Sequence, residues 1–139
     1  MNKEFVPYEP SLDLKELGFD EPCFGYYYTL NGKDWKFADD TQYNLLDELY
    51  NIGSMFTISA PLYQQAFRFF REKHNLEYQI MKSGNGNYYV TIYKNTQEYL
   101  DSIVGLTHAC LDEVVDCYSY EEAELECLRK LIEIVKNNE

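Results

Sequence analysis

The C-terminal segment constrains the fold most strongly, because it predicts an amphipathic helix whose apolar face the rest of the chain must cover. Ser119 is followed three residues later by Glu122, which is the spacing of a capping box at a helix start. Beyond it, apolar residues recur at helical spacing at Ala123, Cys127, Leu128, Leu131, Ile132 and Val135. We therefore predict a helix over residues 119–136 that docks on a hydrophobic core.

A second main helix is predicted over residues 60–74. Ser59 is its expected N-cap, and Pro61 is tolerated in the first turn because no intrahelical donor is needed there. The apolar stripe of this helix consists of Leu62, Tyr63, Ala66, Phe67, Phe69 and Phe70. A shorter helix is predicted over residues 10–17, where Gly18 supplies a left-handed stop.

Alternating and aromatic segments predict an antiparallel sheet. Asn31-Gly32 is a strong hairpin signal between two aromatic segments, and residues 83–87 have the composition of a second hairpin turn. The predicted and candidate strands span residues 24–30, 35–38, 76–82, 88–94, 103–106 and 113–118. Residues 39–54 are ambiguous between a short helix and a loop. The prediction is a single α+β domain over residues 1–139, an antiparallel sheet of four to six strands packed by two main helices.

Composition narrows the class of protein further. Fourteen Tyr and eight Phe are best explained by aromatic strands in a small α+β domain, although tyrosine also suits interfaces and ligand pockets. The four cysteines lack any CxxC pair and the N-terminus lacks the apolar run of a signal peptide, which favours reduced thiols in a cytoplasm. No apolar segment approaches the ~20 residues of a membrane helix, so no membrane contact is expected.

Charge is distributed in blocks. The chain has a net charge of −12, yet residues 59–94 contain two acidic and five basic residues. An acidic surface repels phosphate backbones and favours basic partners, so we expect no direct contact with nucleic acid.

No residue pattern predicts catalysis, a metal or a cofactor. His108, Cys110 and Cys117, with Asp112 or Cys23, offer nitrogen and sulfur ligands but lack the closely spaced pairs of a structural zinc site. Adjacent carboxylates are frequent, but neighbours along a helix or strand point to different sides, which disfavours paired acid–base catalysis. The sequence therefore favours a non-enzymatic protein.

Two groups of residues are candidates for binding. The first would bind a small, nucleotide-like anion by ion pairing and stacking, and comprises Arg68, Arg71, Lys73, His74, Tyr78, Tyr88, Tyr89 and Tyr93. The second would bind a basic partner protein, and comprises Asp112, Glu113, Asp116, Glu121 and Glu124. Cations at a helix C-terminus and carboxylates at a helix start explain both groups without any ligand, and these explanations are the more frequent ones.

Three sequence blocks span most of the chain: FVPYEPSLDLKELGFDEPCFGYY (5–27), APLYQQAFRFFREKHNL (60–76) and YSYEEAELECLRKLIEIVK (118–136). In order and spacing they resemble a family of small, uncharacterised proteins from phages and prophage-like elements of Bacteroidetes. The resemblance implies a mobile-element origin and the cytoplasm of an infected or lysogenic bacterium, but no activity. The resulting hypothesis is an acidic interaction protein, an inhibitor or decoy acting on a host defence protein; the alternative is a binder of a small anion.

Overall fold

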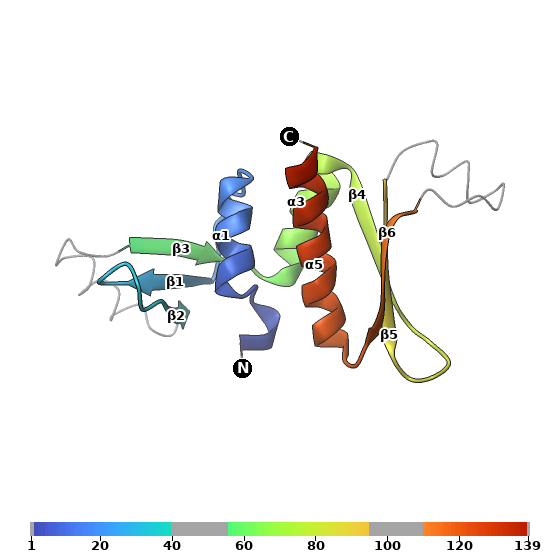
Figure 1. Ribbon diagram of the computed structural model, residues 1–139. Helices are drawn as coiled ribbons and strands as arrows, with labels where there is room; N and C mark the ends of the chain where they lie inside the picture. The colour runs from blue at the N-terminus through green and yellow to red at the C-terminus, as the bar shows by residue number, and fades with distance from the viewer. Residues whose placement is uncertain (1, 40–55, 95–109, 139) are drawn as a thin grey trace. The chain divides into compact units, whose positions relative to one another are not determined.

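Ten elements are seen in the computed structural model, which describes residues 2–39, 56–94 and 110–138, with side chains for residues 3–39, 56–94 and 116–138. In chain order they are η1 (Asn2–Glu4), α1 (Tyr8–Glu16), β1 (Gly25–Thr29), β2 (Lys36–Asp39), β3 (Phe56–Ala60), α3 (Tyr63–His74), β4 (Leu76–Lys82), β5 (Tyr88–Lys94), β6 (Cys110–Cys117) and α5 (Tyr120–Asn137). Internal contacts divide the chain into two compact units, Met1–Gln65 (unit 1) and Ala66–Glu139 (unit 2) (Figure 1).

The α+β class is confirmed. The six described strands form two antiparallel three-stranded sheets, β2-β1-β3 in unit 1 and β4-β5-β6 in unit 2, whereas one sheet of four to six strands was expected. That the chain is a single domain stays a prediction. Apart from Asp39, the ambiguous segment 39–54 lies outside the described residues, as do the candidate strand 103–106 and His108.

In unit 1, the predicted stop of the first helix is confirmed. Gly18 has a φ of +100°, its N–H donates to the carbonyl of Lys15 (3.1 Å), and the N–H of Phe19 donates to the carbonyl of Leu14 (2.9 Å). These two bonds form a Schellman motif, which satisfies carbonyls that the helix end would leave free. Leu14 and Phe19 are both buried, so the motif also fixes the direction in which the chain leaves α1.

The first hairpin is also confirmed, with a loop longer than two residues. The β1–β2 ladder runs from Gly25↔Asp39 to Tyr28↔Lys36. In the connecting loop, Asn31 Oδ1 accepts hydrogen bonds from the backbone N–H groups of Lys33 (2.9 Å) and Asp34 (3.0 Å). The Asn side chain thus replaces a backbone acceptor and holds the turn.

The prediction that Ser59 caps a helix over residues 60–74 is wrong at its N-terminal end. Ser59 belongs to β3, which pairs with β1, and α3 starts at Tyr63. Pro61 accepts a hydrogen bond from the N–H of Val6 (2.8 Å) at its carbonyl. The helix start is satisfied instead by Gln65, whose Oε1 accepts from the N–H of Leu62 (3.0 Å). Ser59 does not act as a helix cap because strand pairing with β1 provides hydrogen bonds for more of the same backbone groups.

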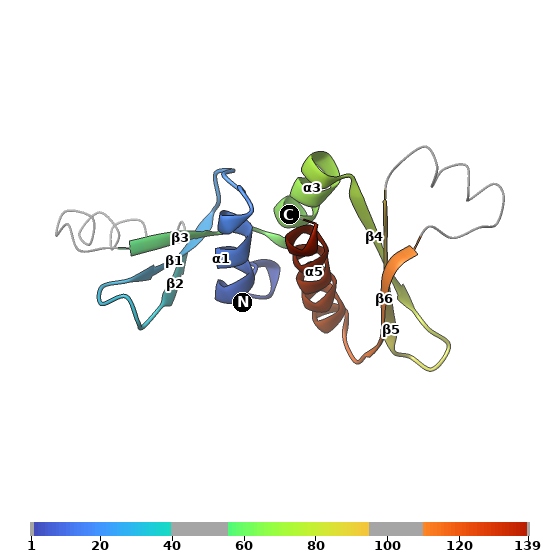
Figure 2. The same ribbon diagram turned by 45° about the horizontal axis from the view of Figure 1, so that its top comes forward.

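In unit 2, the strands predicted over residues 76–82 and 88–94 have the observed boundaries, whereas the candidate strand 113–118 is observed as Cys110–Cys117. The β4–β5 ladder is continuous from Leu76↔Lys94 to Lys82↔Tyr88, and β6 pairs with the other edge of β5. Helices α3 and α5 lie on one face of this sheet in both ribbon views (Figures 1 and 2). The largest fully buried side chains between these helices and the sheet come from α3, β5 and α5, and they are Phe70, Val90, Ile92, Cys127, Leu128 and Leu131. The apolar face predicted for residues 119–136 is therefore the covered face of α5.

Within the described part of the chain, no helix has the length and apolar character required to cross a membrane.

Candidate protein-binding surface

The junction between β6 and α5 exposes both aromatic and acidic side chains. Asp116 has a φ of 65°, a left-handed conformation that Asp tolerates, and it redirects the chain at the end of β6. Ser119 then caps α5, because its Oγ accepts from the N–H of Glu122 (3.1 Å). The Glu122 carboxylate accepts in turn from the N–H of Tyr118 (2.8 Å), one residue before the N-cap. The predicted capping pair is confirmed, and it fixes the backbone on which both neighbouring tyrosines stand.

Tyr118 and Tyr120 are the large side chains that this junction leaves open to solvent. Tyr118 is 79% exposed and Tyr120 is 44% exposed. Asp116, Glu121 and Glu122, which lie within four residues of both tyrosines in the chain, are exposed as well. We call these five residues the Tyr118–Tyr120 surface. Tyrosine is enriched at the energetic centres of protein interfaces, where one side chain buries a ring and still offers a hydroxyl.

Beneath the surface, aromatic rings and a cation connect it to the sheet. The ring of Tyr120 lies edge-on to that of Tyr88, with 5.9 Å between centroids. Lys82 Nζ lies 5.9 Å from the centroid of the Tyr88 ring. This distance is within the range of a cation–π interaction, so the aromatic group already attracts one positive charge of its own chain.

Carboxylates make this corner of unit 2 strongly negative. Burial, and then the nearby Glu121, raise the pKa of the half-buried Glu124 carboxyl. Burial, followed by Glu124 and Cys127, raises the pKa of Tyr120. Burial also raises the pKa of Tyr78 to about 12, with smaller contributions from Tyr120, Cys127, Glu124 and Glu77. Each of these shifts disfavours the negatively charged form of its own group, mainly because burial penalises a charge there and secondarily because neighbouring groups are acidic.

The structure brings together part of the predicted acidic group. Asp116 and Glu121 are exposed on the same junction as the two tyrosines, and Glu124 is half-buried one turn further along α5. Asp112 and Glu113 lie on β6 opposite Ile92 and Thr91, but their side chains are outside the described ones. Tyr118 and Tyr120 were absent from the predicted group, because only the tertiary packing decides which tyrosines of an aromatic-rich chain stay exposed.

The predicted anion-binding cations stand on or next to α3. Arg68, Arg71 and Lys73 are exposed. Arg71 Nη1 lies 3.6 Å from Glu77 Oε1, so its charge is already partnered. The half-buried His74 packs against the rings of Phe69 (5.3 Å) and Phe70 (5.9 Å).

The predicted anion-binding tyrosines do not share one face of the sheet. Tyr88 contacts Tyr120 of α5, and Tyr78 stacks on Phe67 of α3 at 4.1 Å, so both lie on the helix-covered face. Tyr89 and Tyr93 are at odd registers of the same ladder and therefore point to the opposite face. The structure thus does not assemble the eight predicted residues into one pocket.

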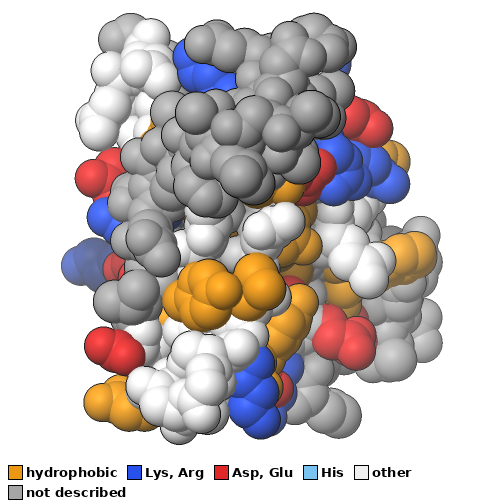
Figure 3. All heavy atoms as spheres, turned by 90° about the vertical axis from the view of Figure 1, so that its right-hand side faces the viewer, with side chains coloured by type: hydrophobic (Ala, Val, Ile, Leu, Met, Phe, Trp, Pro, Cys, Tyr) orange, Lys and Arg blue, Asp and Glu red, His pale blue; other side chains and the backbone are white. Residues whose placement is uncertain are grey.

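The face of the unit 2 sheet turned away from the helices has a mixed character. Its visible part shows hydrophobic side chains near the centre and charged side chains of both signs around them (Figure 3). Met81 and Tyr89 belong to this face, and the Tyr89 hydroxyl donates to Met81 Sδ at 3.3 Å. This mixture does not select the charge of a partner.

The three thiols whose side chains are described, those of Cys23, Cys117 and Cys127, are poorly suited to nucleophilic catalysis. Burial, then Glu21, raises the pKa of the Cys23 thiol to about 11 against the opposing effect of a hydrogen bond with Ser59. Burial likewise raises the pKa values of Cys117 and Cys127. The thiolate is the reactive form, so these thiols are inert near neutral pH. Among the described side chains, no group of three His, Cys, Asp or Glu is placed to hold a metal.

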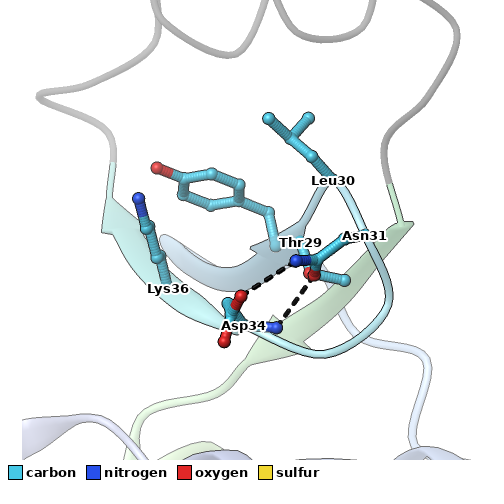
Figure 4. Close-up of a pocket in the computed structure, with 6 residues that line it drawn as sticks. Thr29, Leu30, Asn31, Asp34 and Lys36 are labelled. Carbon is cyan, nitrogen blue, oxygen red and sulfur yellow. Dashed lines mark hydrogen bonds between the residues drawn. The ribbon is translucent and has the colours of Figure 1, made fainter.

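Small hollows are lined by described residues of unit 1, among them the following two. One, of about 140 Å³, opens at the end of the β1–β2 hairpin and is lined by Tyr28, Thr29, Leu30, Asn31, Asp34 and Lys36. The Asn31 amide donates to the Asp34 carboxylate (2.8 Å) and accepts from the loop backbone, so both of its ends serve the turn (Figure 4). The other, of about 160 Å³, lies between α1 and β3 beside Lys15 and Ser59. Neither combines an apolar lining with several convergent free polar groups, as ligand pockets usually do.

Comparisons with protein-family models, with curated proteins and with solved structures gave no match to this chain.

Proposed function

We propose that the protein is a non-enzymatic interaction protein that binds a basic surface of a partner protein through the Tyr118–Tyr120 surface. The observation that carries the proposal is the pairing of two exposed tyrosines with exposed carboxylates on one capped junction. Between Asp116 and Glu126 the chain has five carboxylates and no basic residue. A negative surface of this kind steers a basic partner into contact, and the aromatic side chains supply contact area once it has arrived.

The wider setting of this proposal comes from the sequence. Resemblance to small proteins of phages and prophage-like elements supports a role in the cytoplasm of an infected or lysogenic bacterium. A basic host surface, such as the nucleic-acid-binding face of a defence protein, has the complementary charge. On this proposal the protein occupies that face as an inhibitor or decoy. The rigid, backbone-anchored junction favours such a role, since a preorganised surface loses little conformational freedom on binding.

The test is to isolate a partner from a host lysate with the tagged protein and then measure its affinity at about 50 and 300 mM salt, a range over which the screening length falls about 2.5-fold. We expect the affinity to fall steeply with salt. The double variant Asp116→Lys/Glu121→Lys should slow association, because it reverses charge on the surface. The control is Glu72→Lys, which makes one such charge reversal at an exposed position on α3 and is compared with Glu121→Lys alone. An affinity that changes neither with salt nor in Asp116→Lys/Glu121→Lys would refute the proposal.

The small-anion alternative has less support, because its tyrosines lie on two faces of the sheet and Arg71 is partnered by Glu77. It keeps one supporting observation, the excess of basic residues between residues 59 and 94. A thermal-shift screen of mono-, di- and cyclic nucleotides tests it, since a ligand bound only by the folded state raises the melting temperature. A rise that disappears in Arg68→Ala/Arg71→Ala would favour this alternative over the acidic surface.

A further inference from the structure

The side chain that the Tyr118–Tyr120 surface selects can be inferred from its chemistry. The two tyrosines are two residues apart, so their Cα atoms lie within about 7 Å of each other. Both side chains are accessible, and the chain carries exposed carboxylates close by in sequence, Asp116 two residues before Tyr118 and Glu121 one residue after Tyr120. A partner group that fits here must carry positive charge, cover an aromatic ring and pair with a carboxylate at the same time.

The chain itself demonstrates part of this recognition. Lys82 places its ammonium 5.9 Å from the centroid of Tyr88, whose ring contacts Tyr120. One cation, Lys82, therefore already lies at the ring of Tyr88 within the same chain. Tyr120, at 44% exposure, and Tyr118, at 79%, offer ring surface that this lysine does not cover.

Arginine meets the remaining requirements better than lysine does. Its guanidinium is planar, stacks on aromatic faces, is weakly hydrated and pairs with a carboxylate through two parallel hydrogen bonds. A lysine ammonium is a compact, strongly hydrated charge that satisfies only the electrostatic part. We propose that the Tyr118–Tyr120 surface binds an arginine-rich segment of a partner protein, with guanidinium groups stacked on the tyrosine rings and paired with Asp116 and Glu121.

This proposal rests on the proposed function and adds the identity of the recognised side chain. Charge complementarity selects the occupant. A second copy of the chain would bring another −12 charges to the same surface, and a nucleic acid would bring phosphates, so both are repelled. A basic segment removes this repulsion as it binds.

The experiment uses two fluorescent octapeptides of equal charge, one of eight arginines and one of eight lysines, titrated against the intact protein. Lysine also makes cation–π contacts, so the expected preference for the arginine peptide comes from stacking and carboxylate pairing together and is about two- to fivefold, the size of one exposed cation–π contact. Tyr118→Ala/Tyr120→Ala should lose most of this preference while retaining salt-dependent binding of the lysine peptide. Tyr118→Phe/Tyr120→Phe should keep it, because the rings remain.

The matched control is Tyr89→Ala, which removes a tyrosine from the opposite face of the same sheet and should leave the preference unchanged. Circular dichroism and thermal melting establish that each variant is folded. Equal affinities for the two peptides in the parent protein would overturn the arginine proposal but leave the proposed function standing, since charge alone then explains binding. A preference that survives loss of both tyrosines would also overturn it. Failure of both peptides to bind at low salt would count against both proposals.

Discussion

Replacing Leu128 by alanine tests whether α5 is the element that holds unit 2 together. Leu128 is fully buried between α5 and the sheet, with Leu131 and Cys127 as equally buried neighbours in the helix. Leucine-to-alanine changes at such sites cost about 2–5 kcal/mol, made up of lost apolar transfer energy and the cavity that remains. A rigid strand backbone under the helix limits collapse of that cavity, so we expect a loss of about 3 kcal/mol in the free energy of unfolding.

The assay is thermal unfolding followed by circular dichroism and calorimetry. Unfolding entropy is about 2.1 cal/mol/K per residue near 60 °C, so a loss of about 3 kcal/mol lowers the melting temperature by about 10 °C if all 139 residues unfold together. If unit 2 unfolds alone, the same loss acts on about half as many residues and the shift is about 20 °C, with a second transition that does not move. The measurement therefore also tests the single-domain prediction.

The matched control is Leu125→Ala, which makes the same chemical change at a half-buried position of the same helix and should cost roughly 1 kcal/mol. Melting of Leu128→Ala within about two degrees of the parent would refute the reasoning, because a fully buried leucine cannot be lost at so small a cost.

Three further changes test local features. Gly18→Ala should cost about 1 kcal/mol in denaturant unfolding, because alanine is strained at a φ of +100°, whereas Gly84→Ala, in equally open space without a positive φ, should cost less. Ser119→Ala should cost about 1 kcal/mol through loss of the cap, and Ser119→Asp should recover most of it. Burial raises the pKa of Glu124, so the folded state binds its proton more tightly than the unfolded state does. The free energy of unfolding should therefore fall as the pH rises through the ordinary carboxyl range to the raised pKa. Glu124→Gln should remove that contribution from urea midpoints measured between about pH 4 and pH 8.

The sequence predictions were accurate where residues close together in the chain determine the structure, and they failed where distant segments do. The strands 76–82 and 88–94 were predicted with the observed boundaries, because alternation and a Gly-Asn turn specify a hairpin from its own residues. The start of α5 was predicted from Ser119 and Glu122 for the same reason. In contrast, β3 was missed and Ser59 was taken as a helix cap, since its role depends on pairing with β1, more than thirty residues earlier in the chain.

The same distinction between local and long-range interactions applies to the candidate sites. Adjacent strand residues such as Tyr88 and Tyr89 must face opposite sides of a sheet, so the sequence already contained the reason why one anion pocket cannot use both. The exposure of Tyr118 and Tyr120 has no comparable local signal, because a tyrosine beside a helix cap packs inward or outward according to the path of the preceding strand. Here Asp116 turns left-handed just before the cap and the Glu122 carboxylate holds the N–H of Tyr118. The same two features that end β6 and start α5 thus hold the junction on which both tyrosines and the carboxylates stand, and a change that loosens the cap should weaken partner binding together with stability.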